Sequence, residues 1–223
     1  MKPSPSLKSL QDELRTGLSQ RGERGALQFI KKHPEIARWS FCVTGGHSTY
    51  VLKEFPFGSR HRADIVVLTS YSGAWEIHMI ELEPPNDRII NKDGTPSQRF
   101  NKAISQIHDW DDYIRSNGTA IRKDLSDWCM TKDLLKMHSG SGRPCNYSGD
   151  YLHDPNTYAK WEYHVVIGDR AQMTEAVRRR MNQYSGSLSI GICTYGRFLD
   201  VAANFDKYRS GRFEHFVLTE SEE

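Results

Sequence analysis

The sequence is poor in cysteine and has no long apolar run. Its four cysteines are widely scattered, so no close pair suggests a zinc ribbon or a redox site, and we expect reduced thiols. They are Cys42, Cys129, Cys145 and Cys193. The polar amino terminus lacks the apolar core of a signal peptide, and no stretch approaches the length of a membrane span. These absences predict a soluble, cytoplasmic protein that has no membrane partner.

A strong excess of one charge is also absent. The chain has 30 Lys and Arg residues against 28 Asp and Glu residues, which gives a formal net charge of +2. This near balance permits nucleic-acid binding but does not argue for it. Internal repeats and low-complexity segments are absent as well, and 223 residues are enough for one well-packed domain with at most a small appendage. Any sign of function therefore has to come from local motifs.

The most informative stretch begins with two apolar runs that predict a β-hairpin. Residues 63–68 and 75–83 are rich in Val, Ile, Leu and Trp, and a Ser/Gly turn separates them. Because strands alternate with period two, Glu81 and Glu83 share one face of the second strand. Antiparallel pairing then lays Asp64 beside Met79 or Glu81, depending on the length of the turn. Acids therefore end both strands of the predicted hairpin.

Carboxylates at the end of an apolar hairpin are costly to bury unless a cation or hydrogen-bond donors neutralise them. A hard cation such as Mg²⁺ prefers oxygen ligands and keeps several waters, so Asp64 and Glu81 could share one divalent ion. The alternative is that each acid is simply solvated where its strand leaves the core. That alternative is the commoner case for a single acid, but it does not account for acids at matching ends of paired strands.

The order of these acids resembles a known motif. Asp64 followed by Glu81-Leu82-Glu83 is similar to the Asp…Glu-x-Lys signature of PD-(D/E)XK nucleases, and Gln106 and Trp110 resemble the Gln-x-x-x-Tyr pattern of their later helix. Further segments resemble the nuclease domain of Shedu anti-phage defence proteins, over about residues 24–208. These segments are 26–34, 80–84, 94–97, 106–107, 165–170 and 192–195.

The resemblance implies a metal-dependent DNA endonuclease that acts in anti-phage defence. It implies an α/β fold, with a restriction-endonuclease-like mixed β-sheet flanked by helices and a short N-terminal helical segment. Asp64, Glu81 and the Leu82 carbonyl would hold Mg²⁺ or Mn²⁺, and the catalytic set would be Asp64, Glu81, Glu83 and Gln106. DNA would be the partner, and the protein would form homo-oligomers.

Three positions depart from the family pattern. Glu83 stands where the superfamily usually has Lys, and Trp110 and Gly196 stand where related sequences often have Tyr and Asp. A glutamate cannot donate a hydrogen bond to developing negative charge as a lysine does. Glu83 could instead be a further metal ligand or a general base, or it could mark a degenerate nuclease fold that serves as a nucleic-acid-binding or oligomerising module. A scaffold that assembles through its amino-terminal helices is a third reading.

The flanking segments give a coarse layout. Apolar spacing predicts short helices at 7–18 and 26–30, so we assign an N-terminal helical segment to residues 1–40 and the nuclease-like domain to residues 41–223. A strand is expected at 48–55, ended by Pro56, and a helix should begin after an N-cap at Ser97. On that helix Gln106 could reach the site, while Lys102 is expected to face outwards. Glu54, Arg60 and Arg62 are further candidates near Asp64, although solvated edge positions are the commoner explanation for such residues.

The second half is less readable until residue 161. A helix is possible at 128–138, the Ser/Gly-rich loop 139–144 lacks the ending of a nucleotide-binding P-loop, and His138, Cys145 and His153 fit no strong zinc template. Alternation then predicts further strands and helices. They are a strand at 161–167, a helix at 171–184, a strand at 188–193, a helix at 198–208 and a strand at 213–218. Arg178 to Arg180, with Arg170, could hold a nucleic-acid backbone or form a solvated face.

Overall fold

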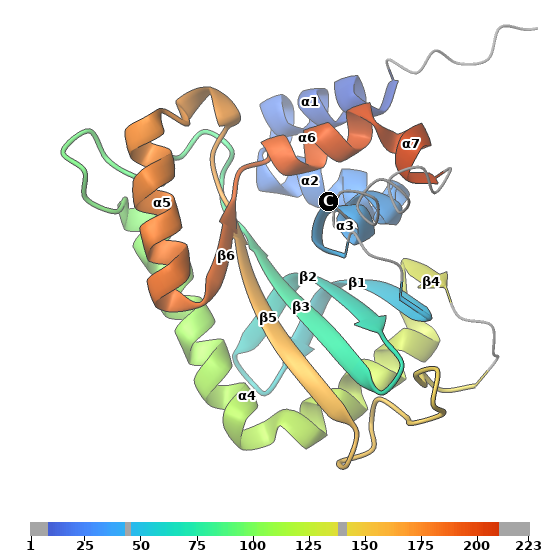
Figure 1. Ribbon diagram of the computed structural model, residues 1–223. Helices are drawn as coiled ribbons and strands as arrows, with labels where there is room; N and C mark the ends of the chain where they lie inside the picture. Colours follow the sequence, from blue (N-terminus) through green and yellow to red (C-terminus); the bar gives the residue numbers. More distant parts are fainter. Residues whose placement is uncertain (1–8, 43–45, 138–141, 210–223) are drawn as a thin grey trace, which may run out of the picture.

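The protein folds around one mixed β-sheet with helices on both faces (Figure 1). The computed structural model describes residues 9–42, 46–137 and 142–209. The strand order is β4-β1-β2-β3-β5-β6, with β3, β5 and β6 parallel to one another and the other neighbours antiparallel. The strands are β1 (Ser48–Phe57), β2 (His61–Ser70), β3 (Ala74–Leu82), β4 (Leu135–Met137), β5 (Tyr158–Val166) and β6 (Ile190–Cys193). The expected α/β class, a mixed sheet flanked by helices, is confirmed.

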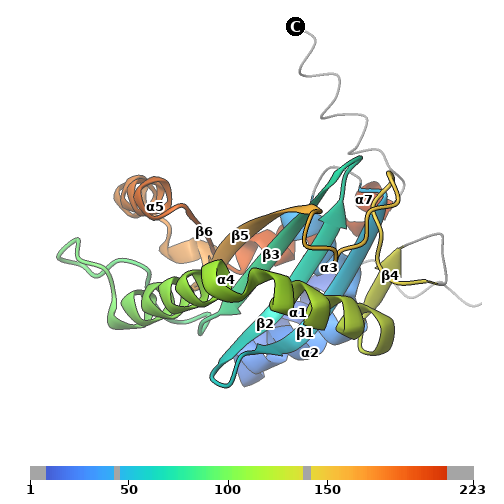
Figure 2. The ribbon, with the colours of Figure 1, turned by 90° about the horizontal axis from the view of Figure 1, so that it is seen from below.

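The two faces of the sheet carry separate hydrophobic cores. The long helix α4 (Gln98–Thr131) crosses one face and packs on Trp75, Ile77 and Met79 of β3. The other face is covered by α1 (Ser9–Arg21), α2 (Glu23–Lys32), α3 (Pro34–Phe41) and α6 (Gly196–Ala203) (Figure 2). Strand alternation produces this division, because Ile80 and Leu82 of β3 belong to the second core.

The amino-terminal helices form a tight unit. The sequence predicts that they cover one side of the sheet, and they do so. Helices α1 and α2 approach so closely that a Cβ atom on Gly25 would lie 2.0 Å from the Gly17 carbonyl oxygen, so this contact requires glycine. Pro34 ends α2 as expected but also begins α3, where a proline at the first helical position is well tolerated. The division of the chain at residue 40 stays a prediction.

Helix α4 and the segment after it correct the sequence-based layout. Ser97 is the N-cap, with its side chain accepting a hydrogen bond from the Phe100 amide, as predicted. The helix then continues through Gly118 to Thr131, so the predicted helix at 128–138 is wrong over its later half, where β4 pairs with β1 instead. Pro56 does not end β1, which runs to Phe57. The register of β4 ends at Val51, so a missing amide at Pro56 interrupts no bond to that strand.

The last third has the predicted alternation with shifted boundaries. Helix α5 (Glu175–Leu188) follows a 3-10 turn, η1 (Arg170–Gln172), and stands at the sheet edge beside β6 (Figure 1). The helix predicted at 198–208 is divided into α6 and the short α7 (Phe205–Arg209). The strand predicted at 213–218 lies outside the described residues.

Candidate active-site cleft

The register of the β2–β3 hairpin places the two candidate acids across from each other. Ile65 pairs with Ile80 and Val66 with Met79, so continuing the ladder by one residue sets Asp64 opposite Glu81. Of the two pairings that the sequence allowed, this is the second. The Leu82 amide donates a hydrogen bond of 2.8 Å to Oδ2 of Asp64, which fixes that carboxylate against the end of β3. The hairpin thus brings Asp64 and Glu81 to one place.

Both carboxylates open into a cleft of about 730 Å³ between the hairpin and α4. Gln106 and Trp110 of α4 line the same cleft, so the helix positions the residues that the resemblance assigned to it. Three cationic side chains also line it: Arg60 just before β2, Arg62 near the start of β2, and Lys102 of α4. The remaining lining residues are His61, Ser105 and Asp109. A cleft with this content suits an anionic ligand that meets the two acids.

The pKa values of the two acids are raised in this setting. Burial is the largest cause at Asp64 and outweighs the hydrogen bond from the Leu82 amide, which lowers the pKa. Burial also raises the pKa of Glu81 well above its ordinary value, and the negative charges of Asp64 and Glu83 raise it further. A hydrogen bond from the Gln106 side chain opposes the shift at Glu81. Without a cation, therefore, the pair favours a state that retains a proton.

Glu83 lies one step away from this pair. Its side chain is 7% exposed, and its Oε2 lies 3.8 Å from Nη1 of Arg99. Glu83 is not one of the residues that line the cleft. Burial raises the pKa of Glu83, whereas the charges of Arg99 and Lys102 lower it. Its backbone is fixed on both sides, because the amide donates to the Val166 carbonyl (2.8 Å) and the carbonyl accepts from the Tyr195 hydroxyl (2.9 Å).

Lys102 is placed differently from the expectation. It is exposed, as predicted, but it does not point away from the site, because it lines the cleft one helical turn from Gln106. Its charge also acts on Glu83. Helical spacing shows that Lys102 lies on a different face of the helix from the core residues, but it does not show which part of the protein that face meets. The structure thus brings a lysine to the site although the motif position itself holds Glu83.

Glu23 is a site residue that sequence reasoning missed. It is the first residue of α2, and its charge raises the pKa values of Asp64, Glu81 and Glu83. A third acidic element therefore approaches the site from the opposite face of the sheet. The only sequence signal was an acid directly after Gly22, which is equally typical of any helix start. The other sequence candidate, Glu54, lies opposite Asp64 in a left-handed backbone conformation (φ 49°) and also raises the pKa of Asp64.

The remaining candidates lie outside this cleft. Among residues 9–42, 46–137 and 142–209, no group of three or more His, Cys, Asp or Glu side chains is arranged to hold a metal, and His138 of the proposed zinc set lies outside these ranges. Arg178 to Arg180 are exposed on α5, where Arg179 pairs with Glu175, which fits a solvated face. In the described residues the four cysteines form no disulfide. In the described part of the chain, no helix has both the length and the apolar character that crossing a bilayer requires.

Fold and cleft together define an α/β protein whose central hairpin presents paired carboxylates to a cationic cleft. Residues 20–199 match the family model described as Shedu protein SduA, C-terminal. The chain therefore belongs to the Shedu family of defence proteins. No curated protein matches the sequence.

Proposed function

We propose that this chain is a metal-dependent endonuclease that hydrolyses DNA phosphodiester bonds in anti-phage defence. One observation supports the proposal most strongly. Asp64 and Glu81 meet across the end of a hairpin, buried enough for their pKa values to rise, in a cleft that also contains Arg60, Arg62 and Lys102. A merely structural pair of acids would have no use for an open cationic cleft, whereas a phosphodiester substrate needs both features.

The donor set fits a hard divalent cation. Two carboxylates whose charged forms are disfavoured by burial and by each other are the groups that a cation would neutralise. Asp64, Glu81 and the Leu82 carbonyl would hold Mg²⁺ or Mn²⁺. When bound, such an ion gathers a phosphate oxygen, lowers the pKa of water and offsets the charge that develops at phosphorus.

Residues in the cleft, and Glu83 next to it, have separate roles in this proposal. Arg60 and Arg62 bind phosphate oxygens of the DNA strand, since guanidinium groups match phosphate geometry. Gln106 holds Glu81 in position through its hydrogen bond. Glu83 accepts a proton from the attacking water, because a carboxylate with a raised pKa is a better base near neutral pH.

A glutamate at position 83 cannot donate a hydrogen bond to the reacting phosphate, and in this proposal Lys102 is the donor instead. It lines the cleft with Asp64 and Glu81, and its ammonium group acts on the pKa of Glu83. A lysine that reaches a phosphate from a helix stabilises developing negative charge as well as one from a strand, provided that it lies at the reacting group. The departure at position 83 is therefore compatible with an active nuclease.

The test is a cleavage assay on supercoiled and linear DNA with Mg²⁺ or Mn²⁺. Asp64→Ala should lower the rate by about 100-fold or more, because it removes one of two side-chain ligands. Asp109→Asn is the matched control, since Asp109 lines the same cleft but is exposed, and it should leave the rate within about twofold. Calorimetry with Mn²⁺ on both variants shows whether metal binding is lost together with cleavage.

A different set of results would support the degenerate module. DNA binding that weakens with salt, needs no divalent ion and is unchanged in Asp64→Ala would mean that the fold binds without cutting. Self-association, which the resemblance implies, stays a prediction, and light scattering at the assay concentration measures it. Cleavage that appears only above the association threshold would indicate that the oligomer is the active form.

A further inference from the structure

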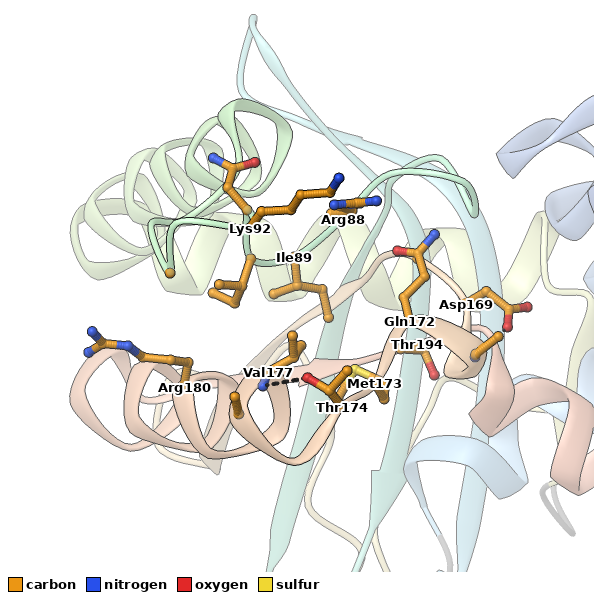
Figure 3. Close-up of a pocket in the computed structure, with 16 residues that line it drawn as sticks. Arg88, Ile89, Lys92, Asp169, Gln172, Met173, Thr174, Val177, Arg180 and Thr194 are labelled. Carbon is orange, nitrogen blue, oxygen red and sulfur yellow. Dashed lines mark hydrogen bonds between the residues drawn. The ribbon is translucent and has the colours of Figure 1, made fainter.

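A second pocket lies outside the candidate active-site cleft. It encloses about 550 Å³ between the loop at residues 84–97 and α5 (Figure 3). Gly168 and Asp169, which follow β5, and Thr194, which follows β6, contribute to its lining, so it sits at the carboxyl ends of parallel strands. Crevices at this end of parallel strands are the usual ligand sites of open α/β sheets. The pocket shares no lining residue with the cleft that contains Asp64.

The walls of this pocket form an apolar slot. Ile89 and Ile90 contribute one wall from the loop, and the other wall comes from Met173, directly after η1, and Val177 of α5. In Figure 3 the side chain of Ile89 points across the gap toward Val177 and Met173. Two facing aliphatic walls provide a place for a flat ring, and the volume falls in the usual range of about 300–1,000 Å³ for small-molecule pockets.

The rim of the slot is cationic. Arg88 and Lys92 border it from the loop and Arg180 from α5, against one acid, Asp169. The Asp169 carboxylate already accepts a hydrogen bond of 2.7 Å from the Ala171 amide. Within the described residues neither Arg88 nor Lys92 forms an ion pair, and in Figure 3 their charged ends point toward one another. Both side chains are exposed, and two cations without an ion-pair partner among the described residues, at one end of the slot, attract an anion.

We propose that this pocket binds a free nucleoside phosphate, with the base between the aliphatic walls and the phosphates on Arg88 and Lys92. The apolar slot has the shape and character to hold the base, and the unpaired cations at one end are suited to bind the phosphates. Gln172, Asn91 and Thr194 provide polar groups for the base edge and the sugar. The proposal is independent of nuclease activity, because it uses none of the residues assigned to cleavage.

Calorimetry tests the proposal on the full chain, without divalent ions, using ATP, GTP, adenosine and tripolyphosphate as probes. ATP or GTP should bind, and adenosine and tripolyphosphate should each bind at least tenfold more weakly, because each lacks half of the recognition. Lys92→Ala should weaken nucleotide binding about tenfold by removing one charged contact. Ala176→Trp, at an exposed lining position, should abolish it by filling the slot. Arg178→Ala is the matched control on the same helix and should change the affinity by less than twofold, since Arg178 does not line this pocket.

Several results would overturn the proposal. If Lys92→Ala and Arg178→Ala weaken nucleotide binding equally, the binding is due to general surface electrostatics. If tripolyphosphate binds as tightly as ATP, the apolar slot does not contribute to the affinity. A ten-residue single-stranded oligonucleotide provides the competing arm. If it binds through Lys92 while free nucleotides do not, the pocket belongs to a DNA strand and not to a mononucleotide. Nucleotide binding that persists in Asp64→Ala, whatever happens to cleavage, separates this proposal from the nuclease proposal.

Discussion

Replacing Glu81 with Gln should stabilise the metal-free protein at alkaline pH. Burial and the neighbouring acids raise the pKa of Glu81 above that of an unfolded chain, so the folded state binds more protons than the unfolded state over the interval between the two values. Stability of the wild type therefore falls as pH rises through this interval. Glu81→Gln removes the ionisation but keeps the shape and an oxygen that accepts the Gln106 hydrogen bond.

The magnitude follows from the size of the shift. Burial and the neighbouring acids raise the pKa of Glu81 to about 9. Each pKa unit corresponds to about 1.4 kcal/mol, and because Glu81 is half-buried and shares its interaction with Asp64, we count only about one unit of this rise as energy that Glu81→Gln recovers. For a domain of this size about 1 kcal/mol moves Tm by about 2–4 °C, which gives a gain of about 3–6 °C for Glu81→Gln at pH 8. The gain should shrink toward zero as the pH approaches about 4.3, the ordinary value for a glutamate.

Thermal unfolding followed by circular dichroism between pH 5 and pH 8, in the presence of EDTA, makes the measurement. Asp109→Asn, in the same cleft but exposed, should show no pH-dependent gain. Adding Mg²⁺ should raise Tm of the wild type and leave Glu81→Gln unchanged, because the variant lacks one ligand of the proposed site. Equal Tm values for Glu81→Gln and wild type at pH 8 would refute the argument that burial of Glu81 is uncompensated.

Further predictions concern metal uptake, the cleft lysine and the support of Glu83. Mn²⁺ affinity should tighten by up to about tenfold per pH unit between pH 6 and pH 8, because Asp64 and Glu81 must ionise to bind the ion. Calorimetry in two buffers should detect the released protons, and an affinity that does not change with pH would contradict the raised pKa values. Lys102→Ala should lower kcat for DNA cleavage by about 100-fold at unchanged Mn²⁺ affinity, and Glu83→Lys in that background should recover part of it, whereas an unaffected rate would remove Lys102 from the mechanism. Tyr195→Phe should cost about 1–3 kcal/mol in urea unfolding, because it leaves the buried Glu83 carbonyl without its donor; a smaller loss would mean that water replaces the hydroxyl.

The hairpin and its acids could be predicted from the sequence because local rules decide them. Alternation along β3 assigns Glu81 to the face of Trp75 and Met79, and a short turn limits the register to two choices. The choice between them depended on the turn, which the sequence did not specify. The helix that carries Gln106 was visible from its N-cap at Ser97 and its apolar spacing.

The site residues that were missed or misplaced depend on tertiary docking. Glu23 reaches the acids because α2 packs beneath the hairpin, and no local pattern states which helix lies there. Lys102 was assigned outwards for the same reason. Helical spacing shows that two faces differ, but it does not show that the cleft opens between them.

The error at 128–138 lies where the long helix α4 ends and a short strand follows. Gly118 lies inside α4, where a glycine costs about 1 kcal/mol relative to alanine. Buried Ile121, Leu125 and Cys129 continue the core-facing spacing beyond it, and their packing on the sheet outweighs that cost. Strand β4 has only three residues, too few for a periodic signal, and it exists because the edge of β1 is open to pair with it.

The hydrogen bond from Tyr195 to Glu83 has a consequence for the order in which the protein is made. Residues at the site come from the start of α2 at Glu23 through to Tyr195, which is close to the carboxyl end of the described chain. Translation supplies the hairpin acids long before Tyr195, so a growing chain carries Asp64 and Glu81 without the support that fixes Glu83. Because 112 residues separate Glu83 from Tyr195, the Glu83 carbonyl gains its donor only after α4, β5 and β6 have been synthesised.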